Sequence, residues 1–232
     1  VPQGTGMSFY STQFVDPSHP FPRLGRFHGF WLAVMALACA LASIHPLDFS
    51  SYLMHQASTL VGVGVMVWLA RDGKISPAGF ALGSLFMLVH ILGAHYLYSN
   101  VPYNDWSKAL LNWDLNDHFG WKRNMYDRLV HFCYGLLLYK LFLDVFSSWF
   151  PQVNRGRVAL LVLQWILASS TIYELIEWWI AIGMSPEKAE QYNGQQGDVW
   201  DAHKDMALAF LGGLIAWIVG RLLPSRHTPL SH

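Results

Sequence analysis

Long apolar runs dominate the chain, and short polar segments separate each run from the next. A membrane-spanning helix needs about 20 mostly apolar residues, and six stretches approach that length. They cover residues 27–44, 52–70, 78–98, 126–150, 158–183 and 200–223. The pattern predicts an all-α, polytopic membrane protein. Its six transmembrane helices form a single bundle over residues 27–223, with no second globular domain.

Lysine and arginine are distributed unequally between the two ends of the predicted bundle. Cytoplasmic loops of membrane proteins carry an excess of these residues. One end has basic pairs beside its connections and termini: Arg23 and Arg26, Arg71 and Lys74, Arg155 and Arg157, Arg221 and Arg226. At the other end, acidic residues dilute the basic ones in the loops 99–125 and 185–197. Both termini, residues 7–26 and 224–232, are therefore expected in the cytoplasm, which requires an even number of spans.

Two shorter segments fall outside this pattern. Residues 1–6 resemble a cloning scar in front of a native Met7 and are excluded from the fold prediction. In the loop between the third and fourth spans, apolar residues recur at helical spacing at Trp106, Leu110, Leu111 and Trp113. This spacing predicts a short amphipathic helix on the outer interface. A packed surface loop with interfacial tryptophans is the alternative.

The composition agrees with a membrane protein. Hydrophobic residues make up 53% of the chain and charged residues only 13%, against about 25% charged in ordinary soluble domains. Acidic and basic residues balance at fifteen each, so no nucleic-acid partner is expected, whereas membrane lipids are. Cys39 and Cys133 lie in apolar runs and are expected to be free thiols.

Ionisable residues within membrane spans are costly and often functional, and here they gather at the outer ends of four spans. They are His90 and His95 on the third span, Asp127 and His131 on the fourth, Glu174 and Glu177 on the fifth, and Asp201 and Asp205 on the sixth. At about 1.5 Å of rise per residue, His131, Glu177 and Asp205 lie roughly 8–9 Å inside their helix ends. Four spans thus place acids and imidazoles at one level.

The spacing along each span decides which of these side chains share a face. Asp127 and His131 are four residues apart and therefore neighbours on one helix face. His90 and His95 are five apart, about 140° around a helix, so only one can point at a common centre, and His95 is favoured. The spacing leaves open whether His90, His118 and Asp198 join that centre.

Several carboxylates in a low-dielectric layer raise one another's pKa, so some are protonated unless a positive charge lies among them, and a divalent metal ion is the simplest source of that charge. The predicted ligands are His95, Asp127, His131, Glu177, Asp201 and Asp205. Oxygen and imidazole ligands without a thiolate suit Mg²⁺, Mn²⁺, Fe²⁺ or Zn²⁺. Arg128 and Lys204 are a second source of positive charge, able to pair with the acids or to receive an anionic head group.

Three motifs carry a family resemblance. Residues 126–132 (YDRLVHF), 173–179 (YELIEWW) and 197–206 (GDVWDAHKDM) together resemble the YjdF-like family of bacterial inner-membrane proteins. The resemblance covers the third to sixth spans and implies a multi-pass inner-membrane protein, without implying a function. A more distant likeness connects the same acidic and histidine pattern with VanZ-like membrane proteins, which are linked to tolerance of glycopeptide antibiotics.

The leading hypothesis is an intramembrane metal-dependent hydrolase or group-transfer enzyme, facing the periplasm and acting on a lipid or lipid-linked substrate of the outer leaflet. A bound metal would lower the pKa of a water molecule, Glu174 would act as general base, and Arg128 would steady a phosphate. An ion- or proton-coupled transporter is one alternative. The other is a non-catalytic structural or binding role, with the polar residues joining the helices.

Overall fold

The computed structural model of the protein describes residues 21–222, apart from the side chains of Glu187 and Gln191. This segment contains nine α-helices and no strand. The helices are α1 Arg26–Ala42, α2 Phe49–Arg71, α3 Pro77–His95, α4 Tyr103–Leu111, α5 Leu115–Phe119, α6 Tyr126–Trp149, α7 Arg155–Ile182, α8 Pro186–Asn193 and α9 Asp201–Leu222. The expected scar 1–6, most of the segment 7–26, and the tail 224–232 lie outside the described residues.

The long helices occupy the predicted apolar runs. Within residues 21–222, the helices α2, α3, α6, α7 and α9 are long and apolar enough to cross a membrane. Helix α1 is also apolar but has only 17 residues. The prediction of an all-helical protein with several membrane spans is therefore confirmed for five candidate spans, and the sixth span stays a prediction.

Polar side chains set where the long helices begin. The Asp48 carboxylate accepts a hydrogen bond from the Ser51 backbone N–H at 2.7 Å at the start of α2. The Ser76 hydroxyl accepts from the Gly79 N–H at 3.0 Å at the start of α3, where Pro77 occupies the first helical position. The first N–H groups of a helix have no partner within it, so these caps satisfy them and fix the helix starts.

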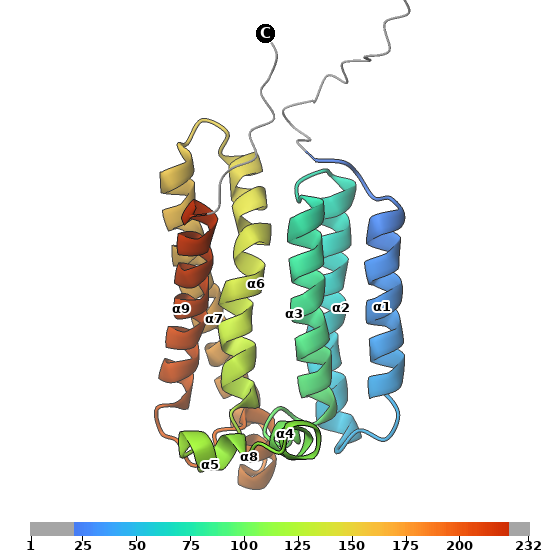
Figure 1. Ribbon diagram of the computed structural model, residues 1–232, viewed down its shortest axis with the longest axis vertical. Helices are drawn as coiled ribbons and strands as arrows, with labels where there is room; N and C mark the ends of the chain where they lie inside the picture. The colour runs from blue at the N-terminus through green and yellow to red at the C-terminus, as the bar shows by residue number, and fades with distance from the viewer. Residues whose placement is uncertain (1–20, 223–232) are drawn as a thin grey trace, which may run out of the picture.

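The bundle has two halves that meet at α3 and α6. Figure 1 shows α1, α2 and α3 on one side and α6, α7 and α9 on the other. Helix α3 packs against α1, α2 and α6, and helix α6 also packs against α7 and α9. Helices α4, α5 and α8 gather at one end, here called the α8 end (Figure 1). The start of α1 and the end of α9 both lie at the opposite end.

The end of α3 differs from the prediction. The apolar run predicted a helix to residue 98, but α3 ends at His95. Leu97 and Tyr98 adopt left-handed backbone conformations, with φ of 52° and 54°, and the Tyr98 N–H donates to the Gly93 carbonyl oxygen at 2.7 Å. A side chain on Gly93 would collide with the Tyr98 ring. Gly93 therefore allows the chain to fold back and turn Tyr98 into the bundle.

Helix α8 lies in a segment for which the sequence predicted only an acidic loop. Ser185 precedes this helix as its N-cap, and Pro186 opens it. Near its end, the Tyr192 ring stacks on the His55 ring of α2, with 4.8 Å between ring centroids and 9° between planes. Tyr192 is buried. Through this contact, α8 connects α7 to the other half of the bundle at the α8 end.

A buried ion pair joins α6 to the start of α3 at the opposite end of the bundle. The Lys140 ammonium donates to the Asp144 carboxylate, which also accepts from the backbone N–H of Ser76 at 3.0 Å. Asp144 is 5% exposed. Removing Asp144 leaves the backbone N–H of Ser76 without its acceptor and the partly exposed Lys140 without its counter-charge. The Asp144→Ala substitution is therefore expected to lower the free energy of unfolding by about 2 kcal/mol.

Thermal unfolding in detergent micelles measures this effect. The matched control is the double variant Lys140→Leu, Asp144→Leu, which removes both charges and should unfold at a higher temperature than Asp144→Ala alone. An Asp144→Ala variant as stable as the unsubstituted protein would show that the pair does not hold α3 and α6 together.

Candidate metal centre and its cavities

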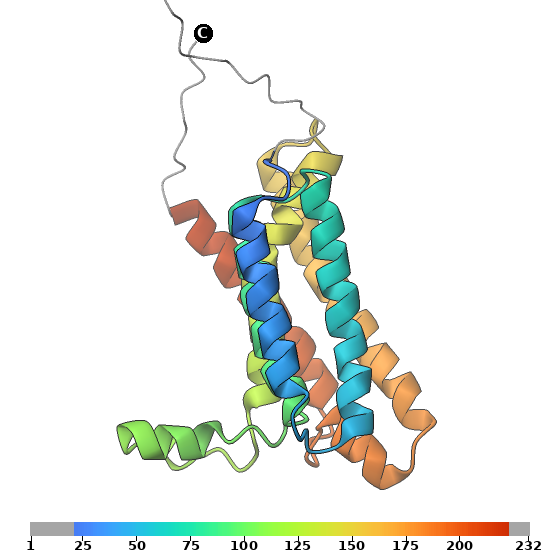
Figure 2. The same cartoon turned by 90° about the vertical axis from the view of Figure 1, so that its right-hand side faces the viewer.

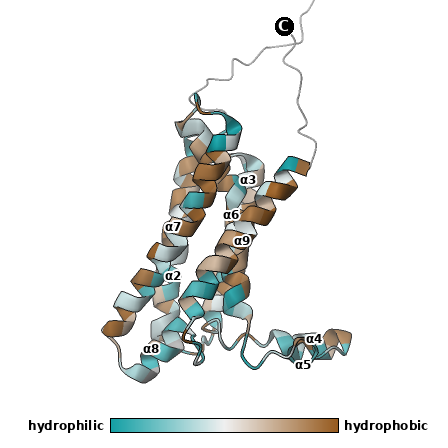
Figure 3. Cartoon of the chain, turned by 90° about the vertical axis from the view of Figure 1, so that its left-hand side faces the viewer, coloured by the Kyte–Doolittle hydropathy of each residue, from teal (hydrophilic) through white to brown (hydrophobic). Residues whose placement is uncertain are grey.

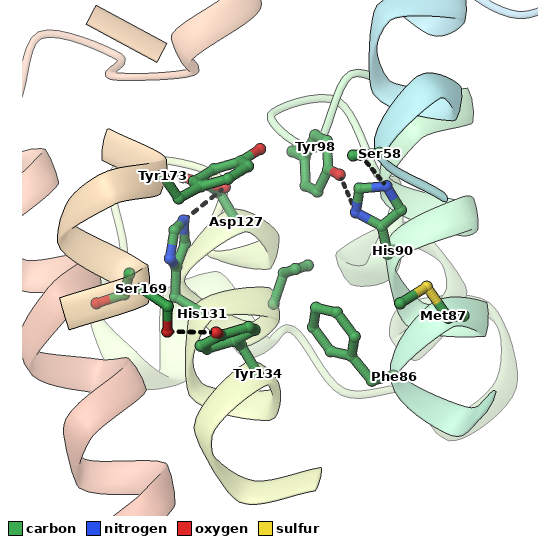
Figure 4. Close-up of a pocket in the computed structure, with 12 residues that line it drawn as sticks. Ser58, Phe86, Met87, His90, Tyr98, Asp127, His131, Tyr134, Ser169 and Tyr173 are labelled. Atoms are coloured by element: carbon green, nitrogen blue, oxygen red, sulfur yellow. Dashed lines mark hydrogen bonds and ion pairs between the residues drawn. The ribbon is translucent and has the colours of Figure 1, made fainter. Parts of the chain in front are cut away.

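Three acidic or imidazole side chains from two helices meet near the α8 end. Asp127 and His131 of α6 and Asp205 of α9 each offer one ligand atom, and these atoms lie within 4.8 Å of one another. The His131 Nε2 atom lies 3.7 Å from the Asp127 Oδ1 atom, a pair visible in Figure 4. It also lies 3.7 Å from the Glu174 Oε1 atom of α7. A divalent ion with oxygen and nitrogen ligands fits such a group.

Two carboxylate oxygens, one in this group and one beside it, are buried and have no hydrogen-bond partner among the described residues. They are the Asp205 Oδ1 and Glu174 Oε1 atoms, and Asp205 is only 2% exposed. Buried polar atoms in folded proteins are nearly always hydrogen-bonded. Both oxygens are therefore free to serve as metal ligands, and a cation between them would compensate their burial.

The close approach of α6 and α9 explains why these residues meet. A side chain on Gly135 would collide with the Ala209 carbonyl oxygen. Gly135 lies one helical turn after His131, and Ala209 lies one turn after Asp205. The two backbones thus touch one turn below the proposed ligands, and this contact sets the distance between His131 and Asp205.

A network of ion pairs around the start of α9 forms the outer rim of the candidate metal centre. The Arg128 Nη2 atom donates to the Asp201 Oδ1 atom at 2.7 Å and to the Asp198 Oδ2 atom at 2.8 Å. The Arg123 Nη1 atom donates to the same oxygen of Asp201 at 2.5 Å. Lys204 donates to Asp198 at 2.7 Å, and this hydrogen bond lowers the pKa of the Asp198 carboxyl. Asp201 and Arg128, predicted as metal ligand and phosphate anchor, therefore bind each other.

The network makes Arg128 a stabilising residue. The Arg128→Gln substitution is expected to lower the free energy of unfolding by about 2 kcal/mol, because hydrogen bonds to two carboxylates are lost, and to leave bound metal unchanged. Lys204→Gln is the control. Its ammonium is half exposed, so its loss should change stability by less than about 1 kcal/mol. Thermal unfolding with metal analysis measures both, and an Arg128→Gln protein that stays fully stable would refute this role.

Two cavities border the group, one acidic and one largely aromatic. The acidic cavity, of about 290 Å³, lies between α7 and α9 and is also lined by Asn193 and Gln195. The carboxylates that line it are Asp127, Glu174, Glu177, Asp201 and Asp205. The aromatic cavity, of about 200 Å³, is lined by residues of α2, α3, α6 and α7 and by Tyr98 (Figure 4). Asp127 lines both cavities, so the proposed ligands lie between them.

The structure separates the two histidines of α3. The His95 Nδ1 atom lies 2.8 Å from the Ala42 carbonyl oxygen at the end of α1, and His95 lines neither cavity. His90 instead lines the aromatic cavity, and its Nδ1 atom lies 2.6 Å from the Tyr98 hydroxyl. The structure thus brings neither histidine into the three-residue ligand group, and the rotation of α3 turns His95, the predicted ligand, toward α1.

Three further residues near the α8 end can be compared with the site predicted from the sequence. Glu177 lines the acidic cavity but is not in the three-residue ligand group. His118 lies on α5, where its ring packs against Trp113 and Phe119 rather than against either cavity. Asn193, which lines the acidic cavity, was not predicted, because an asparagine at the end of a polar segment carries no recognisable signal.

The comparisons with known proteins identify the family. The family model described as "Predicted membrane protein (DUF2238)" matches residues 27–226. The chain belongs to the DUF2238 family. The inner membrane protein YjdF of Escherichia coli (strain K12) is 32% identical over 167 residues, which cover 72% of this chain and 76% of the relative. No solved structure matches the chain.

Membership of the DUF2238 family confirms the resemblance carried by the three motifs. The protein is therefore an integral membrane protein, similar to one from a bacterial inner membrane. Residues 27–226 include every long helix described above, so the proposed ligands all lie in the part that the family shares.

Proposed function

We propose that the protein is an intramembrane metal-dependent hydrolase or group-transfer enzyme whose divalent ion is bound by Asp127, His131 and Asp205. The observation that carries this proposal is the meeting of three ligand atoms within 4.8 Å, one of them on a buried Asp205 whose Oδ1 atom has no partner in the described chain. The ligand set suits Zn²⁺, Mn²⁺, Mg²⁺ or Fe²⁺. When bound by these residues, such an ion would lower the pKa of a water molecule.

Glu174 is the proposed general base. Its Oε1 atom adjoins the ligand His131 at 3.7 Å, and its side chain lines the acidic cavity beside Glu177. A carboxylate at this position can accept a proton from a metal-bound water or extend the ligand set. Asp201 and Arg128, which bind each other, would hold the rim of the cavity.

The unpartnered acids weigh against a purely structural role. Polar residues that join helices do so through hydrogen bonds across the interface, whereas the buried Asp205 Oδ1 and Glu174 Oε1 atoms have none within residues 21–222. Transport requires polar groups on both sides of the membrane midplane. Toward the opposite end, however, Val162, Leu163 and Ile166 pack with Ala209 between α7 and α9. The buried carboxylate at that end, Asp144, is already bound by Lys140 and Ser76.

The proposed orientation has six spans, both termini in the cytoplasm and the metal site near the outer leaflet. Helix α1, with 17 residues, is about 26 Å long, at the short limit for a span. Hydrophobic residues cover the long helices in Figure 3, whereas hydrophilic ones gather around α8 and the start of α9. Basic residues at the opposite end, such as Arg71 and Arg155, support a cytoplasmic location for that end.

Helix α4 would then lie along the outer membrane surface. It projects sideways from the bundle together with α5 (Figure 2). Its residues Leu110 and Leu111 are exposed, as is Trp106, while Asp105 and Lys108 supply polar groups on the same helix. An exposed apolar face on a helix that runs along the membrane plane favours insertion into lipid head groups.

Elemental analysis tests the proposal. Protein purified in detergent without chelators is expected to contain close to one divalent transition-metal ion per chain, or to bind Mg²⁺ stoichiometrically on titration. Asp117→Asn, on the exposed helix α5, is the control and should retain the metal. A pure, folded protein that contains no metal and binds none on titration with all four ions would refute the proposed function.

A further inference from the structure

The acidic cavity offers hydrogen-bond acceptors to a ligand. Three buried oxygens that accept no hydrogen bond within the described chain line it, on Glu174, Asn193 and Asp205. All three are acceptors. Unpaired buried acceptors are costly, so a ligand that enters this cavity gains most by bringing donors.

The charged residues that line the acidic cavity also favour a ligand that brings hydrogen-bond donors. Five carboxylates line it, and no lysine or arginine side chain does. Arg123 and Arg128 neutralise Asp201 at the rim, and the proposed divalent ion would compensate two further carboxylates. The remaining carboxylates, Glu177 among them, have no lysine or arginine beside them in the cavity lining, and a cationic ligand would favour their charged form. A phosphate would be repelled there, whereas an ammonium group would be attracted.

The aromatic cavity on the other side of the ligands has a different character. Phe86, Met87 and Val130 line it together with the rings of Tyr134 and Tyr173. Figure 4 shows the Phe86 and Tyr134 rings directed into the space between the two halves of the bundle. Such a lining favours the hydrocarbon chain of a ligand. Because Asp127 and His131 border this cavity, a chain within it would end beside the proposed metal.

We propose that the substrate is a lipid with a cationic amino head group, whose head lies in the acidic cavity and whose chain lies in the aromatic cavity. This inference rests on the proposed function, because the metal would then face the junction of head and chain. Glu177 binds the ammonium group, and Asn193 accepts a further hydrogen bond from it. An anionic head group on Arg128 is excluded from this arrangement, because that guanidinium already binds Asp198 and Asp201.

Three photoactivatable probes with one chain and different heads test the inference. They are hexadecylamine, hexadecanol and hexadecyl phosphate, each with a diazirine in the chain, and mass spectrometry locates the crosslinks. The amine is expected to label the aromatic cavity, at Phe86, Met87 or Ser170, about tenfold more strongly than either other probe. Equal labelling by the phosphate or the alcohol, or labelling confined to lipid-facing residues such as Leu60, would overturn it.

Variants and metal analysis separate this inference from the proposed function. Glu177→Gln should lower amine labelling about tenfold. Ser170→Trp fills the aromatic cavity and should abolish labelling there, whereas Ile176→Trp, on the exposed face of α7, should not. Metal content is measured on the same samples. Bound metal without a preference for the amine overturns this inference alone, and a protein that binds no metal overturns the proposed function whatever the labelling.

Discussion

Replacing Asp205 by asparagine will weaken metal binding about a hundredfold and will make the metal-free protein more stable to heat. Asp205 provides a charged oxygen to the proposed ligand group, and even residues that only support metal ligands change affinity by about 10–100-fold. Without metal, however, the buried Asp205 lies among Asp127 and Glu174, where like charges repel and burial disfavours ionisation. An amide removes that charge. Metal titration and thermal unfolding in detergent measure the two effects.

Asp201→Asn is the matched control, because the two residues lie one turn apart at the start of α9. Asp201 pairs with Arg123 and Arg128, so asparagine keeps an acceptor oxygen there but removes the negative charge that the two guanidinium groups share. This variant should keep its metal affinity within about threefold and lose about 3 kcal/mol of stability. If both variants lose stability and neither alters metal binding, the cluster joins the helices and holds no ion.

Hydropathy alone predicted the positions of the long helices. The predicted stretch 126–150 corresponds to α6, Tyr126–Trp149, and the stretch 158–183 to α7, Arg155–Ile182. A buried helix in a membrane satisfies its own backbone, so an apolar run of sufficient length has few other structures available. The prediction failed where a local backbone conformation decides, as at the left-handed Tyr98 that ends α3.

The sequence also indicated how far along their helices these side chains lie, but it did not indicate which of them come together. Distance along a helix gives depth directly, and Asp127, His131 and Asp205 indeed meet. Which of His90 and His95 faces inward depends on how α3 is rotated, and contacts with α1 and α6 set that rotation. Likewise, Arg123 lies in the segment 120–125 between α5 and α6, where no periodicity predicts its partner Asp201. Pairing across helices is a property of packing, which hydropathy does not specify.

The contact of α6 with α9 controls both stability and the proposed site. The Gly135→Val substitution will lower the free energy of unfolding by at least about 3 kcal/mol, because its side chain would collide with the backbone of Ala209. Since that contact lies one turn from His131 and Asp205, separating the helices should also reduce metal binding.

Gly220→Val on α9 is the control for this prediction. No atom lies within 4 Å of a Cβ built on Gly220, so the extra volume meets no neighbour and stability should change by less than about 1 kcal/mol. Thermal unfolding and metal analysis of the two variants give the comparison. A Gly135→Val protein that unfolds at the same temperature as the Gly220→Val protein and binds metal equally well would contradict the prediction. It would mean that α6 and α9 can separate without a loss of stability or of metal binding. The distance between His131 and Asp205 would then not depend on the glycine contact.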